Sequence, residues 1–526
     1  MRRRYLLLFI FLLIIVISFK GSSLSFIEAD YNINEVSEKK NVVMIIIDSM
    51  TGEILREGFK NNNFSALLFL AKNGMFYDDL VAPIPSMSVT IESTILTGTM
   101  PDFHRIPGLT WYKPEENRLV NYGSTLKAFL KIGPTAMFED VIYNLNNEHL
   151  SKEVSTVFED LHNRGRTSGA INTLVYRGSR DYEVMVPTLL RKITHSPRNI
   201  ELKGPDILAF GKLVQPELMH EKKLPDSIFK KYGLNDKYSS EVTQTLIRQN
   251  KLPDFSIVYF PDFDKKAHKH GPMYIDGLKK ADQYLGEVLD AYGSWEKAIK
   301  EDIFIVIGDH GQDNTIKNKE KLTIDLDDIY EQYKISRFSG NVDKGEIAFG
   351  NNHRLTYVYS IDEKLSFSNL ANIAMNDNRI ALSAWIENNW INVISPDVNG
   401  IFKFKSGGKW RDKYNQEWTI DGDPNILSIE VHSENKLRYG DYPDILNQLE
   451  SALKSHDVPV MILAAKPGFS FYSEAAPIHK DGGEHGGIHK NEILSAMIIT
   501  GTDEVPHYRR MVDLKSYILS LFDEKS

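Results

Sequence analysis

Three apolar runs in this chain each lead into aspartate, and one of these aspartates is followed directly by histidine. A single such ending is commonplace, because aspartate caps turns and helices. Three of them in a chain without cysteine indicate a shared metal site built from carboxylate and imidazole groups. The residues in question are Asp48, Asp262, Asp264, Asp309 and His310.

Two further segments supply histidine for the same chemistry. Asp264 and His268 have the spacing Asp-x-x-x-His, which brings both side chains to one ion in a helical turn or a compact loop. His485 lies within the glycine-rich stretch Gly482–Gly487, which suits a loop whose backbone approaches a ligand closely. His489 is a competing candidate.

A hydroxyl-rich segment, Pro85 to Gly98, reads as a loop that leads into a helix. Ser88 falls near the start of that helix, where free N–H groups and the helix dipole favour a phosphate group. An ordinary serine N-cap explains the same pattern, so the segment alone leaves both interpretations open.

These residues need a scaffold that brings strand ends together. Continuous β-branched and apolar runs are typical of strands buried on both faces of a parallel sheet. Helical patterns lie between them, at 282–289 and 445–453, so we expect an α/β fold with a mostly parallel sheet flanked by helices. Ligands bind outside the carboxyl ends of such strands. The expected strands are 41–48, 255–260, 303–307, 458–465 and 496–500.

The chain is divided by composition into several parts. Residues 1–22 follow the pattern of a signal peptide or membrane anchor, with Arg2 to Arg4 before an apolar run. Residues 23–40 form a linker, 41–325 and 456–526 form the catalytic domain, and 326–455 form an inserted small α+β subdomain or lid. We therefore expect an exported protein, extracellular or anchored to the outer face of the cytoplasmic membrane, with membrane association through its N-terminal segment.

In this order, the motifs resemble those of the alkaline phosphatase superfamily, in its type I phosphodiesterase/nucleotide pyrophosphatase branch. Ser88 stands nine residues before Thr97-Gly98, as the nucleophile of that branch does, and Pro101-Asp102-Phe103-His104 matches a Pro-x-x-His motif. Asp264 through Pro272 matches Asp-x-x-x-His-x-x-Gly-Pro, which selects Asp264 over Asp262. Asp309-His310-Gly311 and His485-Gly486 match the two remaining motifs.

The resemblance implies an enzyme with two divalent metal ions. Asp264, His268 and His485 would hold one ion, and the other would lie beside Ser88, on Asp48, Asp309 and His310. Zinc is favoured by these ligands, and manganese is compatible with them. The implied reaction is hydrolysis of a phosphate ester, a phosphodiester or a nucleotide pyrophosphate, through a phosphoserine on Ser88.

The chain departs from the branch at two positions. Ile91 occupies the place where an asparagine is usual and where the resemblance implies a phosphate contact, and Arg105 replaces the glycine of His-Gly-Ile. Two alternatives therefore stay open: a phosphomonoesterase or phospho-group transferase acting on envelope lipids or polymers, and an inactive surface binding protein. The net charge of −9, without a basic stripe, argues against nucleic-acid binding through a basic patch.

Overall fold

The computed structural model describes residues 40–123, 128, 131–186, 191–192, 197–219, 222–337, 341–362, 364–474 and 476–523. The expected N-terminal signal peptide or anchor, residues 1–22, lies outside these ranges. Among the described residues, no helix combines the length and apolarity needed to cross a membrane.

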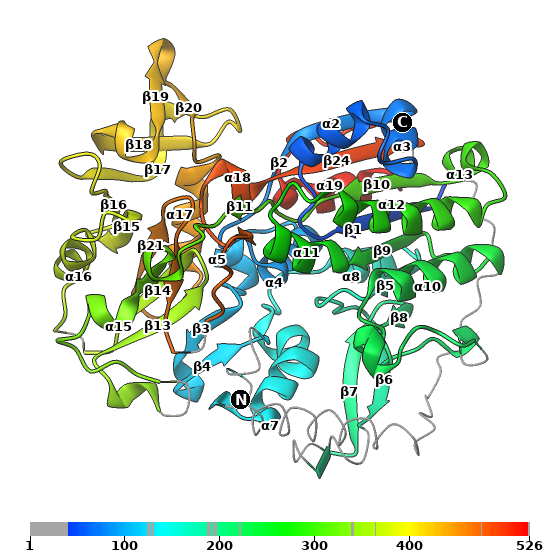
Figure 1. The fold of residues 1–526 in the computed structure, drawn as a ribbon, viewed down its shortest axis with the longest axis horizontal. Helices are drawn as coiled ribbons and strands as arrows, with labels where there is room; N and C mark the ends of the chain where they lie inside the picture. Colours follow the sequence, from blue (N-terminus) through cyan, green and yellow to red (C-terminus); the bar gives the residue numbers. More distant parts are fainter. Residues whose placement is uncertain are drawn as a thin grey trace.

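A seven-stranded sheet forms the larger half of the molecule (Figure 1). Five of its strands are parallel, and β24 runs antiparallel between β10 and β2. This confirms the predicted mostly parallel α/β sheet. In sheet order the strands are β2 (Gly74–Val81), β24 (Leu494–Thr500), β10 (Ile303–Ile307), β1 (Val42–Ile47), β9 (Phe255–Phe260), β5 (Ser168–Ile171) and β8 (Ile207–Ala209).

Both faces of this sheet are covered, which explains why β1 is apolar at every position. Alternate residues of β1 contribute to two separate cores, as the two-residue period of a strand requires. One face packs against α2 (Gly52–Lys60), α3 (Ala66–Lys72), α10 (Asp236–Arg248) and α12 (Ile275–Asp290). The other packs against α4 (Ser88–Thr97), α8 (Val157–Asn163) and α19 (Leu514–Ser520).

A second, nine-stranded and mainly antiparallel sheet forms the other half of the molecule (Figure 1). The run 458–465 belongs here as β21 (Val460–Ala465), between β14 and β15, and not in the central sheet. We propose that the inserted unit extends to this strand. Its elements are β13 (Ile347–Asn352), β14 (Leu355–Ser360), β15 (Ile380–Glu387), β16 (Trp390–Ile394), β17 (Phe402–Arg411), β18 (Glu417–Gly422), β19 (Ile429–His432), β20 (Lys436–Tyr439), α16 (Phe367–Ala374) and α17 (Ile445–Lys454).

Candidate active site

Three neighbouring parallel strands deliver the predicted carboxylates to one edge of the central sheet. Ile47 of β1 pairs with Phe260 of β9, and Ile46 pairs with Ile307 of β10, so the three strands end level with one another. Asp48 follows β1 directly and Asp309 lies two residues after β10. The helix α11 (Asp262–His270) begins just beyond β9.

The first cluster consists of Asp48, Asp309 and His310, which offer ligand atoms to a common point. His310 Nε2 lies 3.4 Å from Asp48 Oδ1 and 3.7 Å from Asp309 Oδ2. All three side chains are buried. Ser88 reaches the same place, where its Oγ donates to Asp309 Oδ2 at 3.2 Å.

The second cluster lies on α11 and on the loop after β23 (Gly483–Glu484). Asp264 and His268 are one helical turn apart, and His268 Nε2 lies 3.3 Å from Asp264 Oδ1. His485 Nε2 lies 3.8 Å from the same oxygen. The His485 ring stacks on His310 with 3.8 Å between centroids, so the two clusters are contiguous.

The histidines of both clusters are oriented through their other ring nitrogen. Nδ1 faces a carbonyl oxygen in each: Gly483 for His268 at 2.8 Å, Ser86 for His485 at 2.6 Å, and Gly311 for His310 at 3.0 Å. A metal-binding histidine is typically fixed in this way, with Nε2 left for the ion.

A divalent ion fits the chemistry of this donor set. Asp48 Oδ1 is buried and has no hydrogen-bond partner among the described residues, although it faces His310. Burial raises the pKa of Asp48 well above its usual range, and the charges of Asp309 and Asp264 add to the effect. Crowded, buried carboxylates of this kind need a cation or protons to neutralise them.

The pKa of Asp264 is shifted in the opposite direction from that of Asp48. Burial alone would raise its pKa, but His268, His485 and His310 around it, together with the Ser49 hydroxyl, hold the pKa well below its usual range. Ser49 Oγ and Gln312 Nε2 both donate to Asp264 Oδ1, at 2.8 and 2.6 Å. Asp264 is therefore held as an anion in the position that the motif predicted.

Ser88 is the first residue of α4, and its side chain does not cap the helix. Met87 occupies the N-cap position without a side-chain hydrogen bond, so the interpretation of Ser88 as an ordinary N-cap is wrong. The free N–H groups of the first turn stay available for an anion. Gly98 ends the helix in the left-handed conformation, at φ 64°, as expected from its place after Thr97.

Tyr259 was missed by reasoning from motifs. Its hydroxyl lies 2.7 Å from Asp48 Oδ2, 3.1 Å from Ser88 Oγ and 3.2 Å from Asp309 Oδ2. The only signal in the sequence is its place near the end of a buried strand, one residue before Phe260. A tyrosine at such a position is interpreted as a residue of the hydrophobic core.

A group centred on Glu484 was missed as well. Glu484 is buried and accepts hydrogen bonds from Nδ1 of His353 and of His479, both at 2.8 Å. Histidine and carboxylate atoms lie 3.3 to 3.8 Å apart in the two clusters, which leaves room for an ion. The 2.8 Å contacts are direct hydrogen bonds instead. His489 caps α18 (Lys490–Ile493) and belongs to neither cluster.

A buried ion pair connects the second sheet to the ligand loops. Arg354, fully buried, contacts Glu492 Oε1 at 3.0 Å. Glu492 Oε2 accepts from the N–H of Gly487 at 2.6 Å, and its backbone carbonyl accepts from Gly311 at 2.7 Å. One residue thus holds both the loop after His310 and the loop after His485.

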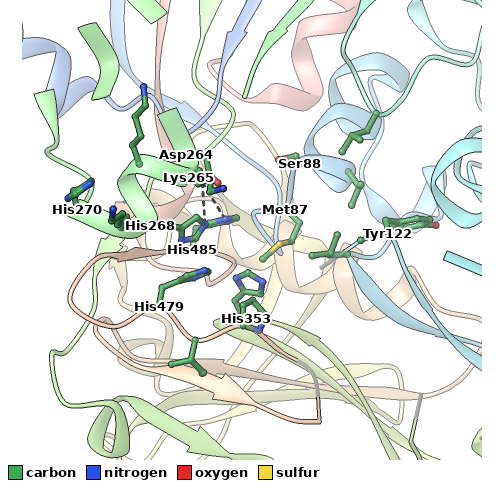
Figure 2. Close-up of a pocket in the computed structure, with 18 of the residues that line it drawn as sticks. Met87, Ser88, Tyr122, Asp264, Lys265, His268, His270, His353, His479 and His485 are labelled. Carbon is green, nitrogen blue, oxygen red and sulfur yellow. Dashed lines mark ion pairs between the residues drawn. The ribbon is translucent and has the colours of Figure 1, made fainter. Parts of the chain in front are cut away.

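A cavity of about 920 Å³ is lined by Ser88, by Asp264, His268 and His485 of the second cluster, and by His353 and His479. Figure 2 shows Ser88, Met87 and Tyr122 on one side of it and His268 and His270 on the other, with Lys265 beside Asp264. Asp264 and His485 lie between them.

The family model described as type I phosphodiesterase / nucleotide pyrophosphatase matches residues 42–488, which include Ser88 and all six predicted metal ligands. The chain belongs to this family. The resemblance inferred from the sequence is therefore confirmed, as is the alkaline phosphatase-like fold.

Solved structures of type I phosphodiesterase relatives share this architecture. Murine ectonucleotide pyrophosphatase/phosphodiesterase 5 aligns with a TM-score of 0.52 at 12% identity, over 92% of this chain and 95% of that chain. The human protein of the same name aligns with a TM-score of 0.53 at 12% identity, over 92% and 94%. A further structure is the inactive murine protein in complex with AMP, with a TM-score of 0.53. No curated protein matches the chain in sequence.

Proposed function

We propose that this protein is a metal-dependent hydrolase of phosphodiester or nucleotide pyrophosphate bonds that forms a phosphoserine on Ser88. The observation that carries the proposal is the position of Ser88 Oγ. It lies at the N-terminus of α4, hydrogen-bonded to Asp309 Oδ2 and Tyr259, beside the group of Asp48, Asp309 and His310 and in one cavity with Asp264, His268 and His485. A known complex of a structurally similar protein with AMP supports a nucleotide-type substrate.

The two ligand clusters and the start of α4 have separate roles in the proposed reaction. Asp48, Asp309 and His310, with Ser88, would hold one divalent ion, and Asp264, His268 and His485 would hold the other. When bound, such ions favour the serine alkoxide and neutralise charge on phosphoryl oxygens. The N–H groups at the start of α4 orient the phosphoryl group, and the short hydrogen bonds to backbone carbonyls keep the histidine rings in place.

The reaction balances as two displacements at phosphorus. Ser88 Oγ forms a bond to phosphorus while its proton passes towards Asp309 Oδ2, which already accepts its hydrogen bond. The bond from phosphorus to the leaving oxygen breaks, and that oxygen takes the electron pair. Water then attacks phosphorus and the bond from phosphorus to Ser88 Oγ breaks. The proton held by Asp309 returns to Ser88 Oγ, and the proton that the water loses neutralises the leaving oxygen. The products are a phosphate ester and the leaving group.

A phosphomonoesterase or phospho-group transferase is the second candidate, and one residue favours it. Ile91 is fully buried in the core and has no polar side-chain atom to offer a diester phosphate. An inactive binding protein is disfavoured, because all the expected ligand positions and the hydroxyl are filled by competent residues. We also propose that the chain is exported through its N-terminal segment.

Purified protein with zinc or manganese should hydrolyse a bis-aryl phosphate diester faster than the matching aryl monoester. Ser88→Ala should lower kcat by about 10³-fold or more and should retain about two metal ions per chain. Ser93→Ala is the matched control, because the Ser93 hydroxyl donates within α4 to Val89 O. Full activity in Ser88→Ala would rule out the phosphoserine.

A further inference from the structure

The buried carboxylate of Glu484 holds two histidines that belong to neither predicted ligand set. Its Oε1 accepts a hydrogen bond from His353 Nδ1, and its Oε2 accepts one from His479 Nδ1, both at 2.8 Å. Glu484 is fully buried and lies directly before His485 in the chain. Because each ring donates through Nδ1, Nε2 is the atom that each histidine can offer to another partner.

The two histidines differ in what their rings can reach. His353 lies in the turn between β13 and β14, its side chain is only 8% exposed, and its Nε2 is buried without a partner among the described residues. The side chain of His479 is 30% exposed and lines the cavity. Since its Nδ1 faces the buried Glu484, the exposed part of the ring is the part directed away from that carboxylate. His479 is therefore the member of this group that can touch a substrate or a water in the cavity.

The position of His479 relative to Ser88 suits the second displacement of the proposed reaction. The His479 ring packs against His268 of the second cluster, with 4.0 Å between ring centroids. Ser88 is hydrogen-bonded to Asp309 of the first cluster, and His485 lies between Ser88 and His479 in Figure 2. In a displacement at phosphorus, the entering oxygen approaches opposite the departing oxygen. A water that displaces Ser88 Oγ therefore arrives from the side of the second cluster, where His479 lies.

We propose that His479, oriented by Glu484, accepts the proton of the water that hydrolyses the phosphoserine. This inference rests on the proposed function and adds to it the group that takes this proton. The water oxygen forms a bond to phosphorus while its proton passes to His479 Nε2, and the bond from phosphorus to Ser88 Oγ breaks as that oxygen takes the electron pair. The proton then passes from His479 to solvent and neutralises the leaving oxygen of the first displacement. Glu484 and His353 are positioning residues, because they act through His479.

Separate measurement of the two displacements tests this role. With bis(4-nitrophenyl) phosphate, rapid mixing measures release of the first 4-nitrophenol, and intact-protein mass spectrometry of acid-quenched samples measures loss of the phosphoryl adduct from Ser88. His479→Gln removes the basic nitrogen, so loss of the adduct should slow by about 100-fold. Release of 4-nitrophenol should change little, because 4-nitrophenolate departs without a proton, and the adduct should accumulate. Equal slowing of both steps, or an unchanged loss of the adduct, would overturn the proposal.

The metal content separates proton transfer from metal binding. After loading with zinc, His479→Gln should hold about two ions per chain, as should the unmodified protein. A loss of zinc in the variant would make His479 a metal ligand and would overturn its role as proton acceptor. Absence of hydrolysis by the unmodified protein overturns the proposed function instead.

Two matched truncations test the anchoring of Glu484. His353→Ala should slow loss of the adduct by about tenfold and leave release of 4-nitrophenol nearly unchanged, because Glu484 loses one of its two histidine donors. His456→Ala is the control. His456 also has a buried Nε2 without a partner in the described part of the chain, but it follows the C-cap of α17 and does not line the cavity. It should leave both steps unchanged, and an equally unchanged His353→Ala would overturn the anchoring role.

Discussion

The hydroxyl of Tyr259 lies among three oxygen atoms of the site, those of Asp48, Ser88 and Asp309. Burial raises its pKa well above the usual range, and the charges of Asp309 and Asp48 raise it further. The phenol therefore keeps its proton throughout the working range of pH. Its single proton is donated to one of these oxygens at a time, so Tyr259 is a neutral donor positioned between the two carboxylates and the serine.

Tyr259→Phe should lower kcat by about 10- to 100-fold, because it removes this donor and keeps the ring in the core. Metal affinity should weaken as well, since Asp48 loses the bond that orients it. Steady-state kinetics and a metal titration measure the two effects. Tyr330→Phe is the control, because that buried hydroxyl donates to Leu370 O in α16. An unchanged kcat in Tyr259→Phe would show that the Tyr259 hydroxyl does not contribute to catalysis.

At this scale, the polar residues that follow strands were predictable, whereas those inside the core were not. Asp48, Asp264 and Asp309 each follow an apolar run. Three buried runs that all lead into a carboxylate indicate a shared site. His353 and Glu484 are far apart in the chain and meet only because the turn between β13 and β14 reaches the ligand loop. No spacing in the sequence encodes that contact.

Among the elements, α4 is buried but has several polar side chains. Most of their hydroxyl groups form hydrogen bonds within the helix. Ser93, Thr94 and Thr97 each donate to the carbonyl four residues earlier. Thr90, whose buried Oγ1 has no hydrogen-bond partner among the described residues, is one exception, and Glu92 is the other. Its Oε2 accepts from Val175 N at 2.8 Å, while its buried Oε1 has no hydrogen bond within the described part of the chain.

Burial raises the pKa of Glu92 to about 8, with a smaller contribution from Asp309, despite the opposing N–H groups of Val175 and Leu174. In the unfolded chain this carboxyl loses its proton near its ordinary value of 4.5. Between these two values the folded state binds the extra proton, so the free energy of unfolding falls as pH rises. The fall is complete by about pH 9 and amounts to at most about 5 kcal/mol.

Glu92→Gln should therefore stabilise the protein at high pH, because Gln keeps the acceptor for Val175 and has no proton to lose. The gain over the unmodified protein should be small near pH 5 and should grow until about pH 9. Thermal unfolding across that interval measures it. An equal gain in stability near pH 5 and near pH 9 would show that the pH dependence does not arise from Glu92.

The strands themselves were predictable, but their partners and directions were not. The runs that form β1, β9 and β10 have the apolar, β-branched composition of buried parallel strands, and they occupy that role. Those that form β21 and β24 look alike in sequence, yet one lies in the second sheet and the other is antiparallel in the first. Burial on both faces determines composition, whereas sheet membership depends on contacts with distant segments.

At the scale of the whole molecule, the ligand loops lie where the two sheets meet. The buried pair of Arg354 and Glu492 ties the second sheet to the loops after His310 and His485. Breaking one partner of such a pair leaves an uncompensated buried charge. The second sheet thus supports the geometry of the site from a distance, in addition to any role in reading the substrate.

The total stability of the protein should depend on divalent ions, because the site buries several carboxylates that repel one another. Without ions, burial and the charges of Asp309 and Asp264 disfavour the charged form of Asp48, as its raised pKa indicates. Binding of ions to the folded state alone raises its stability by mass action. Addition of zinc after removal of metal by a chelator should therefore raise Tm.

Asp48→Asn should reverse the order of stability between the two conditions. In chelator the variant should unfold at a higher temperature than the unmodified protein, because one buried charge is removed while an acceptor for Tyr259 remains. In zinc the order should invert, since the first cluster loses a ligand and with it the gain from binding. Calorimetry at pH 8 with and without zinc measures both differences. If the variant were the less stable protein in chelator as well, Asp48 would be a structural residue and not a carboxylate held in place for an ion.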